Sequence, residues 1–298
     1  MIVKKFKEAA HNQDPRIQAG IAAEKQMAHY LHRFFSDDPN IFVLHGLRLE
    51  DPAQPEHDDS TGVCQIDHLL VHRFGFFIIE CKSVTGEVQV RSDGSGGDEW
   101  TRVNDHCETG MPSPIQQARR QSEFLRKFLY QHAEELVGRL PFGIRTVARL
   151  IYGTDQRGFA RAPIQTIVAV SDKGTIKRID GWKEPQEPFR VFVAKADQVP
   201  DKINQELKLH SRNAKLTKIR GQGDYGIWNM KKPEARTVAR FLAERHVGRI
   251  GVADARPALA QCMHCGSEKL EARRRTRPYY NDYWQCSVCH ENTPMPAE

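Results

Sequence analysis

The stretch Gln65–Ser83, QIDHLLVHRFGFFIIECKS, predicts a hairpin of two apolar strands. Side chains alternate between the two faces of a strand, so Glu80 and Lys82 share one face of the second strand. Asp67 lies in the first strand, in line with Leu69. Charged groups are costly to bury unless they are paired or bind a metal ion. The stretch therefore predicts a polar site within a hydrophobic sheet.

Two carboxylates beside one ammonium group are typical of sites that hold a divalent cation and activate a water molecule next to a phosphate. The simpler interpretation is an exposed cross-strand pair that contributes little to stability. The run Gly75–Ile79, directly before Glu80, contains only glycine, phenylalanine and isoleucine. Such a run predicts a buried strand, which favours the metal site.

A helix is expected before the two strands, because apolar residues recur at helical spacing within Arg16–Phe35. Glu24 lies three residues before Met27 and seven before Leu31, on or beside this apolar stripe. A carboxylate on the stripe needs a partner. A solvated glutamate at the edge of the stripe is the alternative, and both interpretations stay open.

A second helix is expected to open at Pro114, since proline is favourable at the first helical position. Gln117, Gln121, Phe124 and Phe128 then follow at helical spacing, so Gln117 is expected to face inward. The alternative is an ordinary amide on the helix surface.

This order of residues resembles the PD-(D/E)xK nuclease superfamily and, more narrowly, the nuclease-related domain (NERD). The family pattern is a helix with Gly and Glu, an Asp strand, an ExK strand followed by Gly, and an NP-x-x-Q helix start. Ile66 stands where the superfamily name has Pro, and Ser113 stands where the NERD pattern often has Asn. The resemblance covers about the first 130 residues, and its matching residues are Gly20, Glu24, Asp67, Glu80, Lys82, Gly86, Pro114 and Gln117.

The resemblance implies an α/β fold with a restriction-endonuclease-like mixed sheet flanked by helices. It also implies a metal-dependent nuclease that hydrolyses phosphodiester bonds, with DNA as the expected partner and DNA processing, repair or defence as its setting. Asp67 and Glu80 would bind Mg²⁺ or Mn²⁺, helped by the backbone carbonyl of Cys81, while Lys82 would orient or deprotonate the attacking water. The implied catalytic set is Glu24, Asp67, Glu80, Lys82 and Gln117.

A second class of function stays open. The chain can instead be a nucleic-acid-binding or adaptor protein that uses the nuclease fold without cleaving. The acid, acid and lysine positions are all filled, which favours the enzyme. A protein partner or a homodimer is compatible with both interpretations.

Four of the seven cysteines form two knuckles, Cys262-x-x-Cys265 and Cys286-x-x-Cys289, separated by 20 residues. This spacing predicts a structural four-thiolate Zn²⁺ site. A thioredoxin-like motif is disfavoured, because there are two pairs and no βαβ pattern surrounds them. The segment is similar to zinc ribbons of the topoisomerase C-terminal type, for which nucleic-acid binding and protein docking are the competing uses.

The expected organisation is a nuclease-like domain at residues 1–246, with its core at about 16–130. Within it, a strand is expected at Arg190–Val193. Glycines and a proline predict a linker at residues 247–260. The zinc ribbon would occupy residues 261–298.

The net charge of +6 and the pI of about 8.9 give a mild bias towards polyanions. Basic residues concentrate in Lys208–Arg220, where phosphate contacts and a solvated helix face are equally good interpretations. The candidate nucleic-acid contacts are Lys208, Arg212, Lys215, Lys218, Arg220, Arg273, Arg274 and Arg275.

The sequence has no apolar run of 18 or more residues, so we expect no membrane span. The first fifteen residues, MIVKKFKEAAHNQDP, lack the apolar stretch of a secretory signal. We therefore expect a cytoplasmic protein.

Overall fold

A computed structural model describes residues 1–7, 14–104, 107–138, 143–144, 158–159, 162–186, 189–220, 228–248, 265, 267, 269–273, 283–290 and 292–294. The chain divides into two compact units, Met1–Val247 and Gly248–Glu298. Among the helices described in these ranges, none is long and apolar enough to cross a lipid bilayer.

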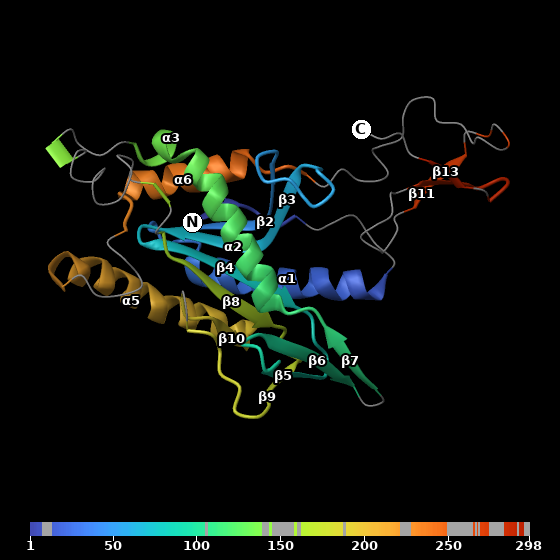
Figure 1. The fold of residues 1–298 in the computed structure, drawn as a ribbon, viewed down its shortest axis with the longest axis horizontal. Helices are drawn as coiled ribbons and strands as arrows, with labels where there is room; N and C mark the ends of the chain where they lie inside the picture. Colours follow the sequence, from blue (N-terminus) through green and yellow to red (C-terminus); the bar gives the residue numbers. More distant parts are fainter. Residues whose placement is uncertain are drawn as a thin grey trace. The chain divides into compact units, whose positions relative to one another are not determined.

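The first unit contains a six-stranded mixed sheet (Figure 1). Its strands are β1 (Ile2–Lys4), β2 (Ile41–Asp51), β3 (Gly62–His72), β4 (Gly75–Lys82), β8 (Ile164–Val170) and β10 (Phe192–Lys195). They lie in the order β1-β2-β3-β4-β8-β10. The pairs within β2-β3-β4 are antiparallel, and the other neighbours are parallel. The expected mixed sheet is confirmed.

Helices cover both faces of this sheet. They are α1 (Pro15–Phe35), α2 (Pro114–Gln131), α3 (Ala133–Val137), α5 (Val199–Arg220) and α6 (Lys232–Glu244), with a short 3₁₀ turn η1 (Ala196–Gln198) before α5. α2, α3 and α6 share a hydrophobic core with one face of the sheet, and α1 and α5 share a second core with the other face. The expected α/β architecture flanked by helices is therefore confirmed.

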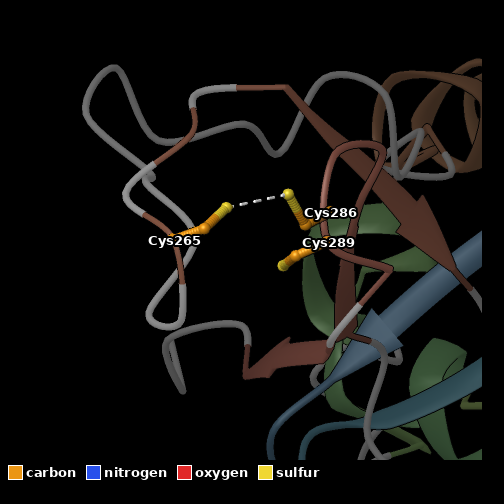
Figure 2. Close-up of side chains that lie close together, drawn as sticks. All are labelled: Cys265, Cys286 and Cys289. Carbon is orange, nitrogen blue, oxygen red and sulfur yellow. Dashed lines mark hydrogen bonds between the residues drawn. The ribbon is translucent and has the colours of Figure 1, made fainter.

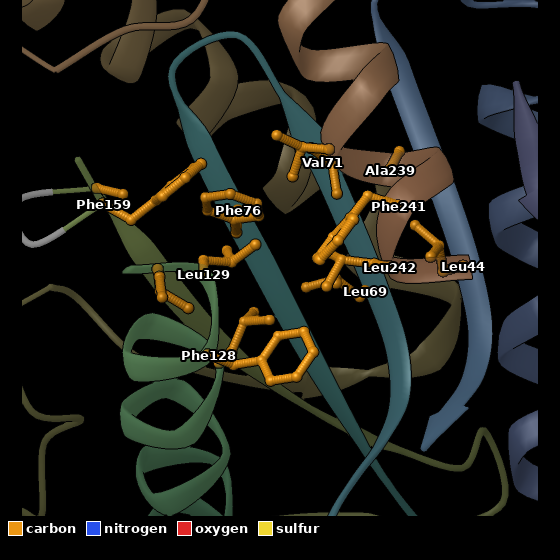
Figure 3. Close-up of a cluster of buried hydrophobic side chains, with 14 of the residues drawn as sticks. Leu44, Leu69, Val71, Phe76, Phe128, Leu129, Phe159, Ala239, Phe241 and Leu242 are labelled. Atoms are coloured by element: carbon orange, nitrogen blue, oxygen red, sulfur yellow. The ribbon is translucent and has the colours of Figure 1, made fainter. Parts of the chain in front are cut away.

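The first core surrounds β4. Phe76 is fully buried, and Figure 3 shows it beside Leu129 of α2 and Phe159. On the neighbouring strands, Leu69 lies against Leu242 of α6 in the same view. Because β4 is covered on both faces, its apolar run is continuous instead of alternating.

The starts of α1 and α2 are fixed by side-chain caps. Asp14 accepts a hydrogen bond from the Arg16 amide at 2.8 Å, and Ser113 accepts one from the Gln116 amide at 3.1 Å. Each cap is followed by a proline at the first helical position, as in Pro114. These caps satisfy backbone donors that would otherwise lack partners, so they fix where each helix begins.

A second, four-stranded sheet follows β4 along the chain and lies near the start of α2 (Figure 1). Its strands are β5 (Glu87–Ser92), β6 (Asp98–Asn104), β7 (Cys107–Met111) and β9 (Thr175–Arg178), in the order β7-β6-β5-β9. Gly86 allows the close approach of β6, because a Cβ atom there would lie 2.7 Å from the carbonyl oxygen of Val103.

The strand expected at Arg190–Val193 is displaced along the sequence. Its ladder with β8 begins at Phe192, opposite Ile167, and ends at Lys195. The Val191 amide instead donates a hydrogen bond of 2.9 Å to the Pro185 carbonyl, so this residue still belongs to the preceding loop.

The second unit contains a three-stranded antiparallel sheet of β11 (Leu270–Arg273), β12 (Tyr283–Cys286) and β13 (Asn292–Pro294). Trp284 is buried against Leu270 in this sheet. Most of the linker expected at residues 247–260 lies outside the described residues.

A buried histidine pair joins α5 to the hairpin of β3 and β4. His210 Nδ1 lies 3.3 Å from His72 Nε2, and the His210 ring stacks on Phe77 with its centroid at 5.2 Å. Burial lowers the pKa of His210 to about 4, and burial followed by the charge of His210 lowers the pKa of His72 as well. Both rings are therefore kept neutral in the folded chain.

This pair predicts acid sensitivity. In the unfolded chain a histidine has a pKa near 6.5, so the unfolded state binds more protons between pH 6.5 and 4. The free energy of unfolding should therefore fall as the pH falls through this window. His210→Phe keeps the stacking and removes one titrating group, so the fall should be smaller by roughly 3 kcal/mol. Urea unfolding at several pH values measures this difference, with exposed His29→Phe as the control; equal acid slopes for His210→Phe and the wild type would contradict the prediction.

Candidate active site and candidate metal centre

The candidate active site begins where the ladder between β3 and β4 ends. The last paired residues are His68 and Ile79. One step further, the Cys81 amide donates a hydrogen bond of 2.8 Å to Oδ2 of Asp67. The same register places Asp67 opposite Glu80, so the two carboxylates belong to neighbouring strands at one position of the sheet.

Glu80 is almost completely buried and has a partner for each carboxylate oxygen. Lys82 Nζ donates to Oε1 at 2.7 Å, and Gln121 Nε2 donates to Oε2 at 2.9 Å. Lys82 Nζ also donates to Gln117 Oε1 at 3.0 Å. The structure thus brings Glu80, Lys82 and Gln117 together, as the sequence predicted.

The electrostatics of Asp67 are unfavourable for a charged carboxylate. Burial is the largest cause that raises its pKa well above the ordinary value, and the charges of Glu80 and Glu24 raise it further. The Cys81 amide and the Lys82 ammonium group act in the opposite direction. Glu24, half-buried on α1, therefore belongs to the electrostatic surroundings of Asp67.

This donor set fits a hard divalent cation. Asp67 and Glu80 offer carboxylate oxygens, which Mg²⁺ and Mn²⁺ prefer, and a cation between them would offset their repulsion. Among the described residues, Asp67, Glu80 and Glu24 do not all bring donor atoms within 4.8 Å of one another, so the three carboxylates do not form a closed ligand cluster.

Gln121 is a site residue that the sequence analysis did not assign. Its Nε2 donates to Glu80 and also to the Gln65 carbonyl at 2.8 Å. It therefore joins β3 to β4 at the place where their own ladder has ended. Its position four residues after Gln117, on the same helix face, was the available signal.

Two of the candidate basic residues of α5, Lys208 and Arg212, lie away from this site. Lys208 and Arg212 are exposed on either side of His210, which contacts His72 at the hairpin end of the sheet. Glu80 lies at the other end of β4, roughly 17 Å away at the rise of a strand. Lys215, Lys218 and Arg220 belong to α5, but their side chains lie outside the described residues.

The candidate metal centre lies in the second unit. The Sγ atoms of Cys265, Cys286 and Cys289 all lie within 4.8 Å of one another (Figure 2). Cys265 Sγ and Cys286 Sγ are 3.6 Å apart, too far for a disulfide. Tetrahedral Zn²⁺ with Zn–S bonds of about 2.3 Å needs sulfur atoms about 3.8 Å apart, so the separation fits this metal.

Hydrogen bonds lower the pKa of the Cys286 thiol and so favour its ionised form. A hydrogen bond from the Cys289 backbone is the largest cause that lowers its pKa, and the Val288 amide adds a contact of 3.4 Å. Thiolate is the form that binds zinc. The fourth expected ligand, Cys262, lies outside the described residues.

The arginines expected near this centre are only partly described. Arg273 is exposed on β11 and forms an ion pair of 2.8 Å with Glu271. Arg274 and Arg275 lie outside the described residues.

Comparison with known proteins assigns the first unit to a family. No curated protein and no solved structure matches the chain. The nuclease-related domain (NERD) family matches residues 19–170, just over half of the 298 residues and further than the first 130 that the resemblance covers. The match runs from α1 to the end of β8 and contains every residue of the candidate active site. The chain therefore belongs to the nuclease-related domain family.

Proposed function

We propose that this chain is a metal-dependent nuclease of the PD-(D/E)xK type that hydrolyses phosphodiester bonds, with DNA as its substrate. The observation that carries the proposal is the buried pair Asp67 and Glu80 on neighbouring strands, with the Lys82 ammonium group hydrogen-bonded to Glu80 and to Gln117. A purely structural sheet gains nothing from two buried carboxylates at one position, since burial of like charges is costly.

Asp67, Glu80 and the Cys81 carbonyl would hold Mg²⁺ or Mn²⁺, and Glu24 would complete the shell. When bound, the cation would lower the pKa of a water molecule and offset the charge on the phosphate. The protein itself would fix the two carboxylates, because each has a main-chain or side-chain donor that restricts its orientation. In metal sites, donors that hydrogen-bond to the ligands supply such a fixed orientation.

Lys82 would act on the water and the phosphate. Its ammonium group is held between Glu80 Oε1 and Gln117 Oε1, so it is already oriented before substrate arrives. From this position the ammonium form would orient the attacking water and stabilise charge that develops on the phosphate oxygens, whereas only the neutral amine form could deprotonate that water. Gln117 would keep the lysine in place.

For the second unit, we propose a structural zinc ribbon at residues 261–298 with Cys262, Cys265, Cys286 and Cys289 as ligands. The support is the cysteine cluster and the small size of its sheet, which a metal would stabilise. We propose nucleic-acid binding as its use.

The nuclease proposal predicts the effect of removing one carboxylate charge. Glu80→Gln keeps the side-chain shape but removes a metal ligand, so cleavage should fall by at least roughly 100-fold. The measurement is cleavage of single-stranded, duplex and flapped DNA with Mg²⁺, Mn²⁺ or EDTA. Lys82→Ala should slow cleavage while DNA binding is retained.

Glu99→Gln is the matched control, because this exposed carboxylate pairs with Arg91 outside the candidate site. It should cleave like the wild type. Retained cleavage by the folded Glu80→Gln variant would contradict the assignment of Glu80 as a metal ligand. A wild type that binds DNA but never cleaves it would favour a silent binding or adaptor module instead.

A stability measurement tests the same carboxylate pair without an assay of cleavage. Asp67→Asn removes the negative charge that repels the Glu80 carboxylate. The amide oxygen of the new asparagine can still accept a hydrogen bond from the Cys81 amide. In EDTA the variant should therefore be more stable than the wild type, by about 1 kcal/mol. Added Mn²⁺ should raise the melting temperature of the wild type and not that of the variant. A less stable variant, or equal Mn²⁺ effects, would contradict the pair as a metal site.

The zinc proposal predicts about one Zn²⁺ per purified chain, measured by atomic emission. Cys286→Ser should lose the metal, because Cys286 lies within reach of both other described cysteines. Cys107→Ser, an exposed cysteine outside the cluster, should keep it. A wild type without zinc, or a Cys286→Ser variant with full zinc content, would refute the site.

A further inference from the structure

The inner face of the second sheet carries two basic residues, Arg102 and Arg178, which share a face with Val88 and Val90 in the strand registers. Val88, Val90 and Trp100 are buried on this face. Arg102 is two residues after Trp100 in β6 and pairs with Val88 in the register of β5 and β6, so its side chain shares their face. It is only partly exposed.

Arg102 differs from the other cations of this sheet. The four strands contain three further basic residues, and each forms an ion pair: Arg91 with Glu99 at 2.8 Å, Lys177 with Glu87 at 3.7 Å and Arg178 with Glu184. In contrast, Arg102 Nε is buried and has no hydrogen-bond partner among the described residues, none of whose carboxylates forms an ion pair with Arg102. A buried donor on a charged group costs free energy when it has no hydrogen-bond partner.

The core beneath this sheet locates Arg102 relative to the candidate active site. Val88, Val90 and Trp100 pack with Val168 and Val170 of β8. These two valines are the register partners of Glu80 and Lys82, and paired residues of neighbouring strands share one face of a sheet.

The start of α2 belongs to the same core. Ile115 packs there, two residues before Gln117. On the other side, Gly86 lies against Val103, the residue after Arg102. Arg102 therefore lies on the same side of the six-stranded sheet as Lys82 and Gln117.

We propose that Arg102 binds a phosphate group of the nucleic-acid strand, next to the phosphate held at Glu80 and Lys82. The inference rests on the proposed function for the identity of the ligand. A guanidinium group presents several N–H donors in a planar fork, which suits phosphate oxygens, and no carboxylate of the described residues competes for the donors of the partly exposed Arg102. The basic residues of α5 described above lie at the opposite end of β4, so Arg102 is the better placed cation.

The test compares Arg102→Gln with Arg91→Gln, which removes the same charge from the same sheet but on an exposed, ion-paired side chain. Fluorescence anisotropy would follow a labelled short DNA, single-stranded or duplex, with Ca²⁺ in place of Mg²⁺ to prevent cleavage. Arg102→Gln should raise the dissociation constant roughly 10-fold. It should also reduce the slope of log K against log salt by about 0.7 for the single strand or 0.9 for the duplex, as for one lost phosphate contact. Arg91→Gln should leave both unchanged.

Thermal unfolding separates this role from a structural one. Removal of an unsatisfied buried cation should leave the melting temperature unchanged or raise it, whereas loss of a structural contact would lower it. With Mg²⁺, Arg102→Gln should raise KM more than it lowers kcat, since the contact is to a neighbouring phosphate. Equal DNA affinity and salt slope in Arg102→Gln and the wild type, or no DNA binding by the wild type, would overturn the proposal.

The two proposals fail in different ways. Active cleavage with DNA affinity unaffected by Arg102→Gln would remove Arg102 and keep the nuclease. A wild type that never cleaves but loses affinity through Arg102→Gln would remove the nuclease and keep Arg102 as a phosphate contact.

Discussion

The hydrogen bond from the Cys81 amide to the Asp67 carboxylate is the interaction on which the rest of the candidate site depends. In an ordinary antiparallel ladder this amide would bond to a main-chain carbonyl of β3. Here a side chain takes the place of that carbonyl, so the two strands stop pairing after His68 and Ile79 yet stay fixed to each other. The result is a pair of acidic side chains held at one point of an otherwise apolar sheet.

Helix α2 compensates for much of what this arrangement costs. Gln117 and Gln121, one turn apart, supply an acceptor for Lys82 and donors for Glu80 and the Gln65 carbonyl. These contacts depend on where the helix begins, which the cap at Ser113 fixes. The charge of Asp67 remains only partly compensated within the protein, as its raised pKa indicates. A partly compensated buried charge of this kind is characteristic of sites whose arrangement serves ligand binding and lowers the stability of the fold.

The second sheet extends the same site. Its inner valines and Trp100 pack on the β8 residues that neighbour Glu80 and Lys82, and its close approach requires the absence of a side chain at Gly86. The outer charges of the sheet neutralise one another in cross-strand pairs. The sheet therefore contributes shape and two basic residues on its inner face, of which Arg178 is paired with Glu184 and Arg102 has no ion pair among the described residues.

Local patterns in the sequence indicated the features that depend on neighbours a few residues apart. Strand alternation indicated the shared face of Glu80 and Lys82, helical spacing and Pro114 indicated the inward position of Gln117, and the cysteine spacing indicated the candidate metal centre. Features that depend on distant segments came from the tertiary structure. In the folded chain, Gln121 joins β3 to β4 where their ladder has ended, and Lys208 and Arg212 lie at the hairpin end of the sheet. The last strand begins at Phe192, and Arg102 lies on the inner face of the second sheet. Register, packing and the pairing of charges bring these residues together across the fold; the spacing of Gln121 from Gln117 is a local signal, but it does not name the strands that Gln121 joins.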